Sequence, residues 1–147
     1  MIYITSDHGG YKLKNEIVQI LRSIDVKVED LGPKELNEGD DYPEYTLKLI
    51  EKLKENLSDN KGIVICRNGV GVSVLANKFK GIRAALSWNP EHAVSTRNDD
   101  DSNVLALPAD YIDSDTAYQT VGAWLNKDFS GDEKHIRRLE VVKEFGQ

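Results

Sequence analysis

Short apolar runs typical of β-strands alternate along the chain with stretches whose apolar residues recur at helical spacing. The strand-like runs are Ile2–Thr5, Val26–Leu31, Gly62–Cys66, Ile82–Ser87 and Asn103–Leu107. Consecutive parallel strands are joined by crossovers that usually contain a helix, so this alternation favours a parallel sheet. We therefore predict a three-layer α/β domain with a parallel sheet of five strands.

The stretches between these runs carry the predicted helices. Apolar residues recur at helical spacing in the first of them, as at Leu13, Ile17 and Leu21. Further helices are predicted for residues 47–57, 72–77, 90–98, 114–124 and 132–145. Asn89 and Asp113 precede two of them and have side chains suited to capping a helix N-terminus. The chain length of 147 residues fits one domain, 1–147, without a linker.

Composition and charge argue against several classes of partner and location. Charged residues make up 30% of the chain and hydrophobic residues 39%, which is the balance of an ordinary globular protein. A net charge of −6 disfavours nucleic acid and anionic membrane surfaces as partners. The single cysteine cannot form an internal disulfide, and the sequence has neither a signal-peptide pattern nor a membrane-spanning apolar run. We therefore expect a cytoplasmic protein.

The stretch Gly62–Ser73 carries the strongest chemical signal. Its strand ends on Cys66, and Gly69 and Gly71 follow just before a predicted helix. Glycines allow a tight turn whose N–H groups approach a ligand, and the dipole of the helix favours a nearby thiolate. Cys66 could therefore be a base or nucleophile, although a lone cysteine is more often a small buried hydrophobe. The stretch lacks both the third glycine of a dinucleotide site and the Gly-Lys-Ser/Thr ending of a nucleotide phosphate loop.

Two other segments hold candidate ligand-binding groups. Ser6–Gly10 places polar side chains and glycines at the end of the first strand. Ligands of open α/β sheets bind at the carboxyl ends of the strands, so this segment is a second site candidate. Lys134 and Arg138 lie four residues apart, on one face of the last predicted helix. They could bind a phosphate or form a solvated helix face, and their spacing does not decide between the two.

Eight motifs together resemble the type B ribose-5-phosphate isomerases, a family that includes the two subunits of galactose-6-phosphate isomerase. The motifs are Ser6-Asp7-His8-Gly9-Gly10, Asp41-Tyr42-Pro43, Gly62-Ile63-Val64-Ile65-Cys66, Gly69-Val70-Gly71, Ala76-Asn77-Lys78, Gly81-Ile82-Arg83-Ala84-Ala85-Leu86, Asn103-Val104-Leu105-Ala106-Leu107 and His135-Ile136-Arg137-Arg138. The resemblance covers nearly the whole chain. It implies a Rossmann-like α/β/α fold, a phosphorylated sugar as substrate, and neither a cofactor nor a metal ion. It also implies a homodimer or a dimer of dimers, with each active site built from two subunits and the last helix packed on the partner.

The same resemblance assigns roles to particular residues. Cys66 would be the base that moves a proton between C2 and C1 of an open-chain sugar phosphate through an enediol. Asn68 is placed beside it on physical grounds, since the family usually has threonine there: N–H groups from Asn68 to Ser73 can stabilise the negative oxygen of that intermediate. The implied substrate-binding residues are Asp7, His8, Tyr42, Arg67, Gly69, Val70, Gly71, Ser73 and Asp100, and the implied phosphate-binding residues are Lys134 and Arg138.

The chain departs from the family at positions that would face the ligand. Asp99 stands where the family has the catalytic histidine that opens the furanose ring, and Asp110 stands where it often has a phosphate-binding arginine. An aspartate has an ordinary pKa of about 3.9, so we expect Asp99 to be a poor proton donor unless its neighbours raise that pKa. Asp99 could instead pair with Arg67. His8 is the other candidate for ring opening, whereas His92 is expected on a solvated helix surface.

Several functions remain open on the sequence alone. The first is an aldose–ketose isomerase, with ribose 5-phosphate and ribulose 5-phosphate as the default pair. An isomerase of another sugar or sugar phosphate is favoured by Arg67, Asp99 and Asp110. A binding protein that has lost catalysis would keep the pocket, but the presence of Cys66 weighs against it. A phosphoacceptor signalling domain would be expected to carry an aspartate at the position of Cys66.

Overall fold

The computed structural model describes residues 1–147 and is built around a five-stranded sheet in the order β2-β1-β3-β5-β4. The strands are β1 (Ile2–Ser6), β2 (Val28–Asp30), β3 (Lys61–Cys66), β4 (Ala84–Leu86) and β5 (Val104–Pro108). Every neighbouring pair of strands is parallel. The carboxyl ends of all the strands therefore lie at one end of the sheet, where ligands of such sheets bind.

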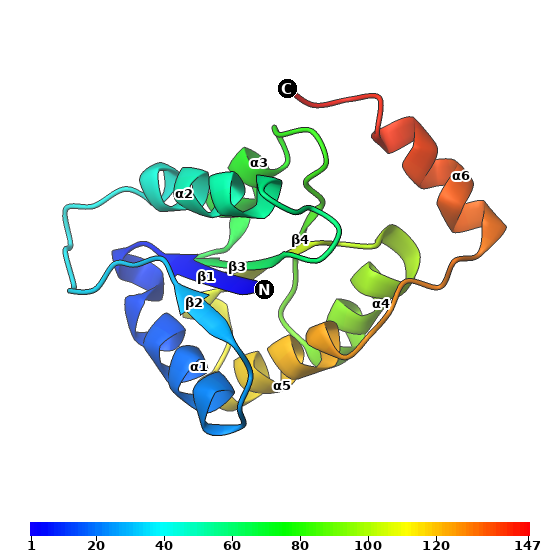
Figure 1. Ribbon diagram of the computed structural model, residues 1–147. Coiled ribbons are helices and arrows are strands. Elements are labelled where there is room, and N and C mark those ends of the chain that lie inside the picture. The colour runs from blue at the N-terminus through cyan, green and yellow to red at the C-terminus, as the bar shows by residue number, and fades with distance from the viewer.

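Helices cover both faces of the sheet, which confirms the predicted three-layer α/β/α fold (Figure 1). One face is covered by α1 (Tyr11–Ser23), α4 (Pro90–Asp100) and α5 (Ser114–Leu125), and the other by α2 (Tyr42–Lys54) and α3 (Val70–Ala76). Successive side chains of β3 alternate between these two faces. Ile63 and Ile65 enter the core beneath α1 and α5, whereas Val64 and Cys66 enter the core beneath α2 and α3. Cys66 therefore faces the helices that follow the candidate site loops.

The observed boundaries differ from the prediction most clearly at the two edge strands and at α2, and the helices predicted at 72–77 and 132–145 span Val70–Ala76 and Glu133–Val142. β2 and β4 are shorter than the apolar runs that predict them, since each pairs on one side only. α2 begins at Tyr42, earlier than the predicted start at residue 47, and Pro43 occupies its first turn. Both predicted caps are confirmed, because Asn89 accepts the N–H of His92 and Asp113 accepts the N–H of Thr116.

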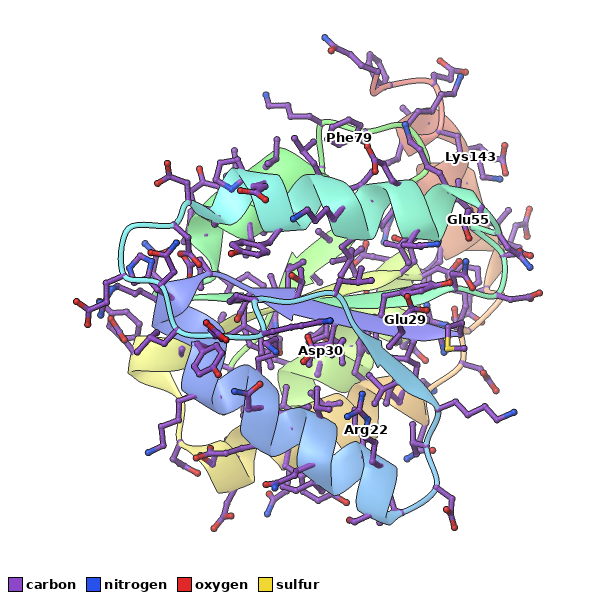
Figure 2. All side chains as sticks on the ribbon, turned by 60° about the vertical axis from the view of Figure 1, so that its left-hand side comes forward. Arg22, Glu29, Asp30, Glu55, Phe79 and Lys143 are labelled. Carbon is purple, nitrogen blue, oxygen red and sulfur yellow. The ribbon has the colours of Figure 1, made fainter.

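The last helix, α6 (Glu133–Val142), lies apart from the two helical layers, near the amino ends of the strands (Figure 1). His135 is its only buried residue. A groove of about 540 Å³ separates α6 from the start of β4, and its apolar lining includes Phe79, Ile136 and Leu139. In Figure 2, Phe79 and Lys143 mark the two sides of this groove. The rest of the chain therefore covers α6 only in part.

No helix of the structure is long and apolar enough to cross a membrane.

Candidate active site

Cys66 ends β3 and turns its thiol toward the loop that leads into α3. The Cys66 Sγ atom accepts the backbone N–H of Gly69 at 3.2 Å and lies 3.7 Å from Asn68 Oδ1. The same amide oxygen of Asn68 accepts the N–H of Val70 at 3.0 Å. The residue is 5% exposed, so it lies just below the surface of the turn. The thiol, the Asn68 amide and two backbone N–H groups are thus held in one compact turn.

Two glycines give this turn its shape. Gly69 has a φ of +71°, a conformation that side chains rarely adopt, and a Cβ there would stand 2.5 Å from Leu86 Cδ1. A Cβ on Gly71 would stand 2.7 Å from Cζ of Tyr42, so the Tyr42 ring lies directly against that glycine. Ser73 completes the first turn of α3, where its Oγ donates to the Val70 carbonyl at 2.9 Å. The structure therefore brings together the predicted residues from Cys66 to Ser73 and adds Tyr42 to them.

The end of β1 forms a second turn that packs against the first. A Cβ on Gly9 would overlap Arg67 Cγ, so the two turns touch at this glycine. Asp7 is buried, and its Oδ1 accepts the N–H of Gly10 at 3.2 Å. Burial raises the pKa of the Asp7 carboxyl, while the hydrogen bond from Gly10 and the charge of His8 oppose that rise. Asp7 and His8 thus lie beside the Cys66 turn, as their places at the strand ends predicted.

The loop before α2 supplies an acid that the sequence analysis did not identify as a site residue. Asp40 Oδ1 accepts the backbone N–H of His8 at 2.9 Å and lies 2.8 Å from its Nδ1. This hydrogen bond is the main cause that raises the pKa of His8 above 6.5. The charge of Asp7 acts in the same direction, whereas burial and Arg67 oppose it. Asp40 stands two residues before Tyr42, and that proximity to a motif residue was the only signal for it in the sequence.

Arg67, at the end of β3, and Asp110, which follows β5, form a pair. Arg67 Nη1 lies 3.7 Å from Asp110 Oδ2, and the Asp110 N–H donates to the Arg67 carbonyl at 2.8 Å. Both side chains are largely exposed, so the ion pair itself is weak. Within one chain Arg67 does not pair with Asp99, because Asp110 follows β5 at the same sheet end as Arg67 whereas Asp99 lies beside His135.

Asp99, Asp100, Lys134 and Arg138 lie near the opposite end of the sheet from Cys66. α4 carries the chain from the carboxyl end of β4 back to the amino end of β5, so Asp99 and Asp100 precede the start of β5. Val104 pairs with Gly62, and Cys66 lies four residues further along β3, a distance of about 13 Å. Within one chain, these residues therefore do not join the Cys66 turn.

Asp99 lies instead beside the basic end of α6. Its Oδ1 is 3.6 Å from His135 Nε2, and the other ring nitrogen of His135 is 2.7 Å from Ser130 Oγ. A hydrogen bond from Asn98 lowers the pKa of Asp99 below 3.8, and the charges of His135, Lys134 and Arg138 lower it further. Asp99 is therefore ionised at neutral pH, as predicted, and cannot readily donate a proton.

His92 is less solvated than expected. Its ring stacks on Trp88 with a centroid separation of 4.6 Å, and its Nδ1 lies 3.0 Å from Ser87 Oγ. Trp88 and Ser87 hold this ring at the start of α4, so His92 lies half-buried on the helix surface that the sequence predicted to be solvated.

Comparison with known proteins identifies the family of the chain. The family model described as Ribose/Galactose Isomerase matches residues 2–142. The ribose-5-phosphate isomerase B of Escherichia coli (strain K12) is 38% identical over 136 residues, which are 92% of this chain and 89% of that protein. A probable ribose-5-phosphate isomerase B of Mycoplasma pneumoniae is 40% identical over 96% of this chain and 91% of that protein.

Solved structures agree with this assignment over nearly the whole chain. Ribose-5-phosphate isomerase B of Mycoplasma genitalium, solved with bound ribulose-5-phosphate, superposes with a TM-score of 0.93 at 36% identity, covering 97% of this chain and 93% of that one. The Clostridium thermocellum enzyme gives 0.91 at 42% identity, with 97% and 95% covered. The chain therefore belongs to the ribose/galactose isomerase family, whose members are aldose–ketose isomerases of sugar phosphates.

Proposed function

We propose that this protein interconverts ribose 5-phosphate and ribulose 5-phosphate, with Cys66 as the base that carries the proton. The observation that supports this most directly is the Cys66 thiol, placed at a strand end with the Gly69 N–H directed at its sulfur. Asp7, His8 and Tyr42 lie on the adjoining turns and offer hydrogen-bonding groups for sugar hydroxyls. The bound ribulose-5-phosphate of the Mycoplasma genitalium relative supports the choice of substrate pair.

The chemistry needs one base and one site for a negative oxygen. The Cys66 thiolate takes the proton from C2 of the open-chain aldose, and the electron pair of that C–H bond forms the C1–C2 double bond. The carbonyl electrons move to O1, which receives the proton that the C2 hydroxyl gives up, and the O–H electron pair of that hydroxyl forms the C2 carbonyl. The thiol returns its proton to C1. N–H groups between Asn68 and Ser73 stabilise the negative oxygen of the enediolate, because they are fixed before the charge develops.

A second copy of the chain completes the site in this proposal. Lys134, Arg138 and Asp100 are too far from Cys66 in their own chain to share a substrate of this size with it. α6 also leaves large apolar side chains open, since Ile136 is 44% and Val141 58% exposed. A homodimer in which α6 packs on the partner would cover this surface and carry Lys134 and Arg138 to the phosphate. The same arrangement would carry Asp100 to the sugar.

Another sugar phosphate is the second candidate substrate. Arg67 is already paired with Asp110, so it is only partly available to neutralise a phosphate. Asp99 adds a negative charge beside Lys134 and Arg138, the proposed phosphate ligands. Both features favour a substrate whose size or charge differs from that of ribose 5-phosphate. A protein that only binds sugars is disfavoured, because such a protein has no need for the Cys66 thiol.

The test is proton exchange with heavy water, followed by NMR across five- and six-carbon aldose and ketose phosphates. The parent protein should exchange the C2 proton of its aldose substrate and form the ketose. Cys66→Ala should do neither while still binding the sugar. A parent that exchanges no proton on any of these compounds would contradict the isomerase proposal, and exchange by Cys66→Ala at the parent rate would contradict the role of Cys66.

A further inference from the structure

Proton transfer at Cys66 leaves the buried Asp40 carboxylate without a role. Its side chain is 4% exposed, and one oxygen, Oδ1, is committed to both the backbone and the ring of His8. The other oxygen, Oδ2, forms no hydrogen bond of normal length, although the pKa of the Tyr45 hydroxyl is raised by burial and by its closeness to Asp40. Ser6 Oγ, two residues before His8, is the only other buried side-chain polar atom in that condition. Unpaired buried polar atoms cost stability, so the unpaired oxygen of the carboxylate that holds His8 points to a ligand or a catalytic function.

We propose that His8 opens the furanose ring of the substrate and that Asp40 is the positioning residue that orients its imidazole. The inference rests on the proposed function, because only a cyclic sugar phosphate needs this step. Asp40 occupies Nδ1 of the ring, which leaves Nε2 as the nitrogen that can face a substrate. Asp99 lies beside Asp100, Lys134 and Arg138 and would reach the site from the partner with them, but its lowered pKa leaves it ionised and without a proton to donate.

Opening of the furanose ring moves protons only among the imidazole of His8, the sugar and one water molecule. His8 gives its Nε2 proton to the ring oxygen as the bond between that oxygen and C1 breaks, and the bonding electrons stay on the oxygen. The anomeric hydroxyl loses its proton to water, and its O–H electron pair becomes the second bond of the C1 aldehyde. The protonated water returns a proton to Nε2. The open-chain sugar is then the substrate for proton transfer at Cys66, on the neighbouring turn.

The charges around His8 suit a proton donor of this kind. Asp40 and Asp7 favour the imidazolium, whereas Arg67 and burial oppose it. The pKa of His8 is raised as a result, so a larger fraction of the ring carries its proton near neutral pH. The two bonds to one carboxylate oxygen also restrict rotation of the ring, because the backbone N–H and the side chain of His8 share that acceptor.

The experiment measures ring opening separately from isomerisation. In a Cys66→Ala background, which stops proton transfer at C2, saturation-transfer NMR follows the exchange between the α and β anomers of ribose 5-phosphate. Each exchange requires the ring to open and close. We expect Cys66→Ala to accelerate this exchange over the rate in buffer. Adding His8→Asn should reduce the acceleration on the order of 100-fold, the usual contribution of a general acid.

Substitutions in the Asp40 loop complete the test. Adding Asp40→Asn should cause a partial loss of the acceleration and move its pH profile to lower pH, whereas Glu38→Gln, an exposed acid in the same loop, should leave both unchanged. Failure of Cys66→Ala to accelerate anomer exchange, or full acceleration with His8→Asn present, overturns the assignment of ring opening to His8. Full acceleration and an unchanged pH profile with Asp40→Asn overturn the positioning role. The proposed function is tested independently by C2 proton exchange in the parent.

Discussion

The sulfur of Cys66 accepts the backbone N–H of Gly69 at 3.2 Å, across a turn whose left-handed backbone and contact with Leu86 favour glycine at that position. The hydrogen bond ties the proposed base to the start of α3. Its donor is fixed by backbone geometry, so it needs no side-chain rearrangement when the sulfur loses its proton.

The first prediction concerns Gly69. An alanine there would have to adopt a left-handed conformation, which costs about 1–2 kcal/mol, and its methyl group would meet Leu86. We expect Gly69→Ala to lower the free energy of unfolding by more than about 1 kcal/mol and to slow turnover by displacing the N–H from Cys66. Urea denaturation and steady-state kinetics measure the two effects.

Gly122→Ala in α5 is the matched control, because a methyl group there meets nothing and should stabilise the helix by about 0.5–1 kcal/mol. Equal stability of both variants would contradict the account of this turn.

The second prediction concerns Cys66 itself. Cys66→Ala should abolish turnover with little change in sugar binding, because the variant loses the proton carrier but keeps the backbone of the turn. Isothermal titration with the sugar phosphate measures binding, and coupled assays measure turnover. Cys66→Ser should also lose nearly all turnover, since a hydroxyl ionises far less readily than a thiol at neutral pH. Turnover near the parent rate in either variant would show that another group carries the proton.

Residues in continuous motifs were the part of the site that the sequence predicted well. Cys66, Gly69 and Gly71 lie within one strand–turn–helix segment, so their mutual positions follow from local geometry. The parallel sheet places the Asp7–His8 turn beside them, because neighbouring strands end at the same edge. These residues could be found without any knowledge of the chain path between the strands.

Asp40 could not be predicted in this way. It reaches His8 through the path of residues 31–39, a segment without helix or strand, and no periodic pattern encodes such a path. Asp99 illustrates a related difficulty, because its partner His135 comes from a helix whose packing is decided by tertiary contacts. Local pattern therefore located the base and its turn, but it located neither Asp40 nor the partner of Asp99.

The third prediction concerns pH. His8 has a raised pKa in the folded protein, so its contact with Asp40 contributes stability fully below pH about 6.5 and loses it as the pH rises through the folded-state pKa. Asp40→Asn removes the carboxylate, so it should destabilise the protein more at pH 6 than at pH 9 relative to the parent. Urea denaturation of both proteins at the two pH values measures this difference. An equal difference in the free energy of unfolding between parent and variant at both pH values would mean that Asp40 does not hold the protonated ring of His8. NMR titration of the His8 ring should show its pKa falling in the variant.

The last prediction concerns how the site is shared between subunits. If Cys66 of one chain acts with Lys134 and Arg138 of another, two inactive variants should complement each other when their subunits mix. In a mixed dimer of Cys66→Ala with Arg138→Ala, one site contains both changes, and the other contains an intact Cys66 and an intact Arg138. Mixing the two variants under conditions that exchange subunits should therefore restore turnover, whereas each variant alone stays impaired.

Arg138→Ala alone should raise the KM for phosphorylated sugars far more than for unphosphorylated ones, because the guanidinium binds the phosphate. Glu140→Ala, which changes an exposed residue on the same helix, is the control and should change the KM for neither class of sugar. Mass spectrometry verifies that the subunits have exchanged. If they exchange and turnover does not recover, Cys66 and Arg138 act in separate sites, and the proposal of a site shared between subunits is wrong.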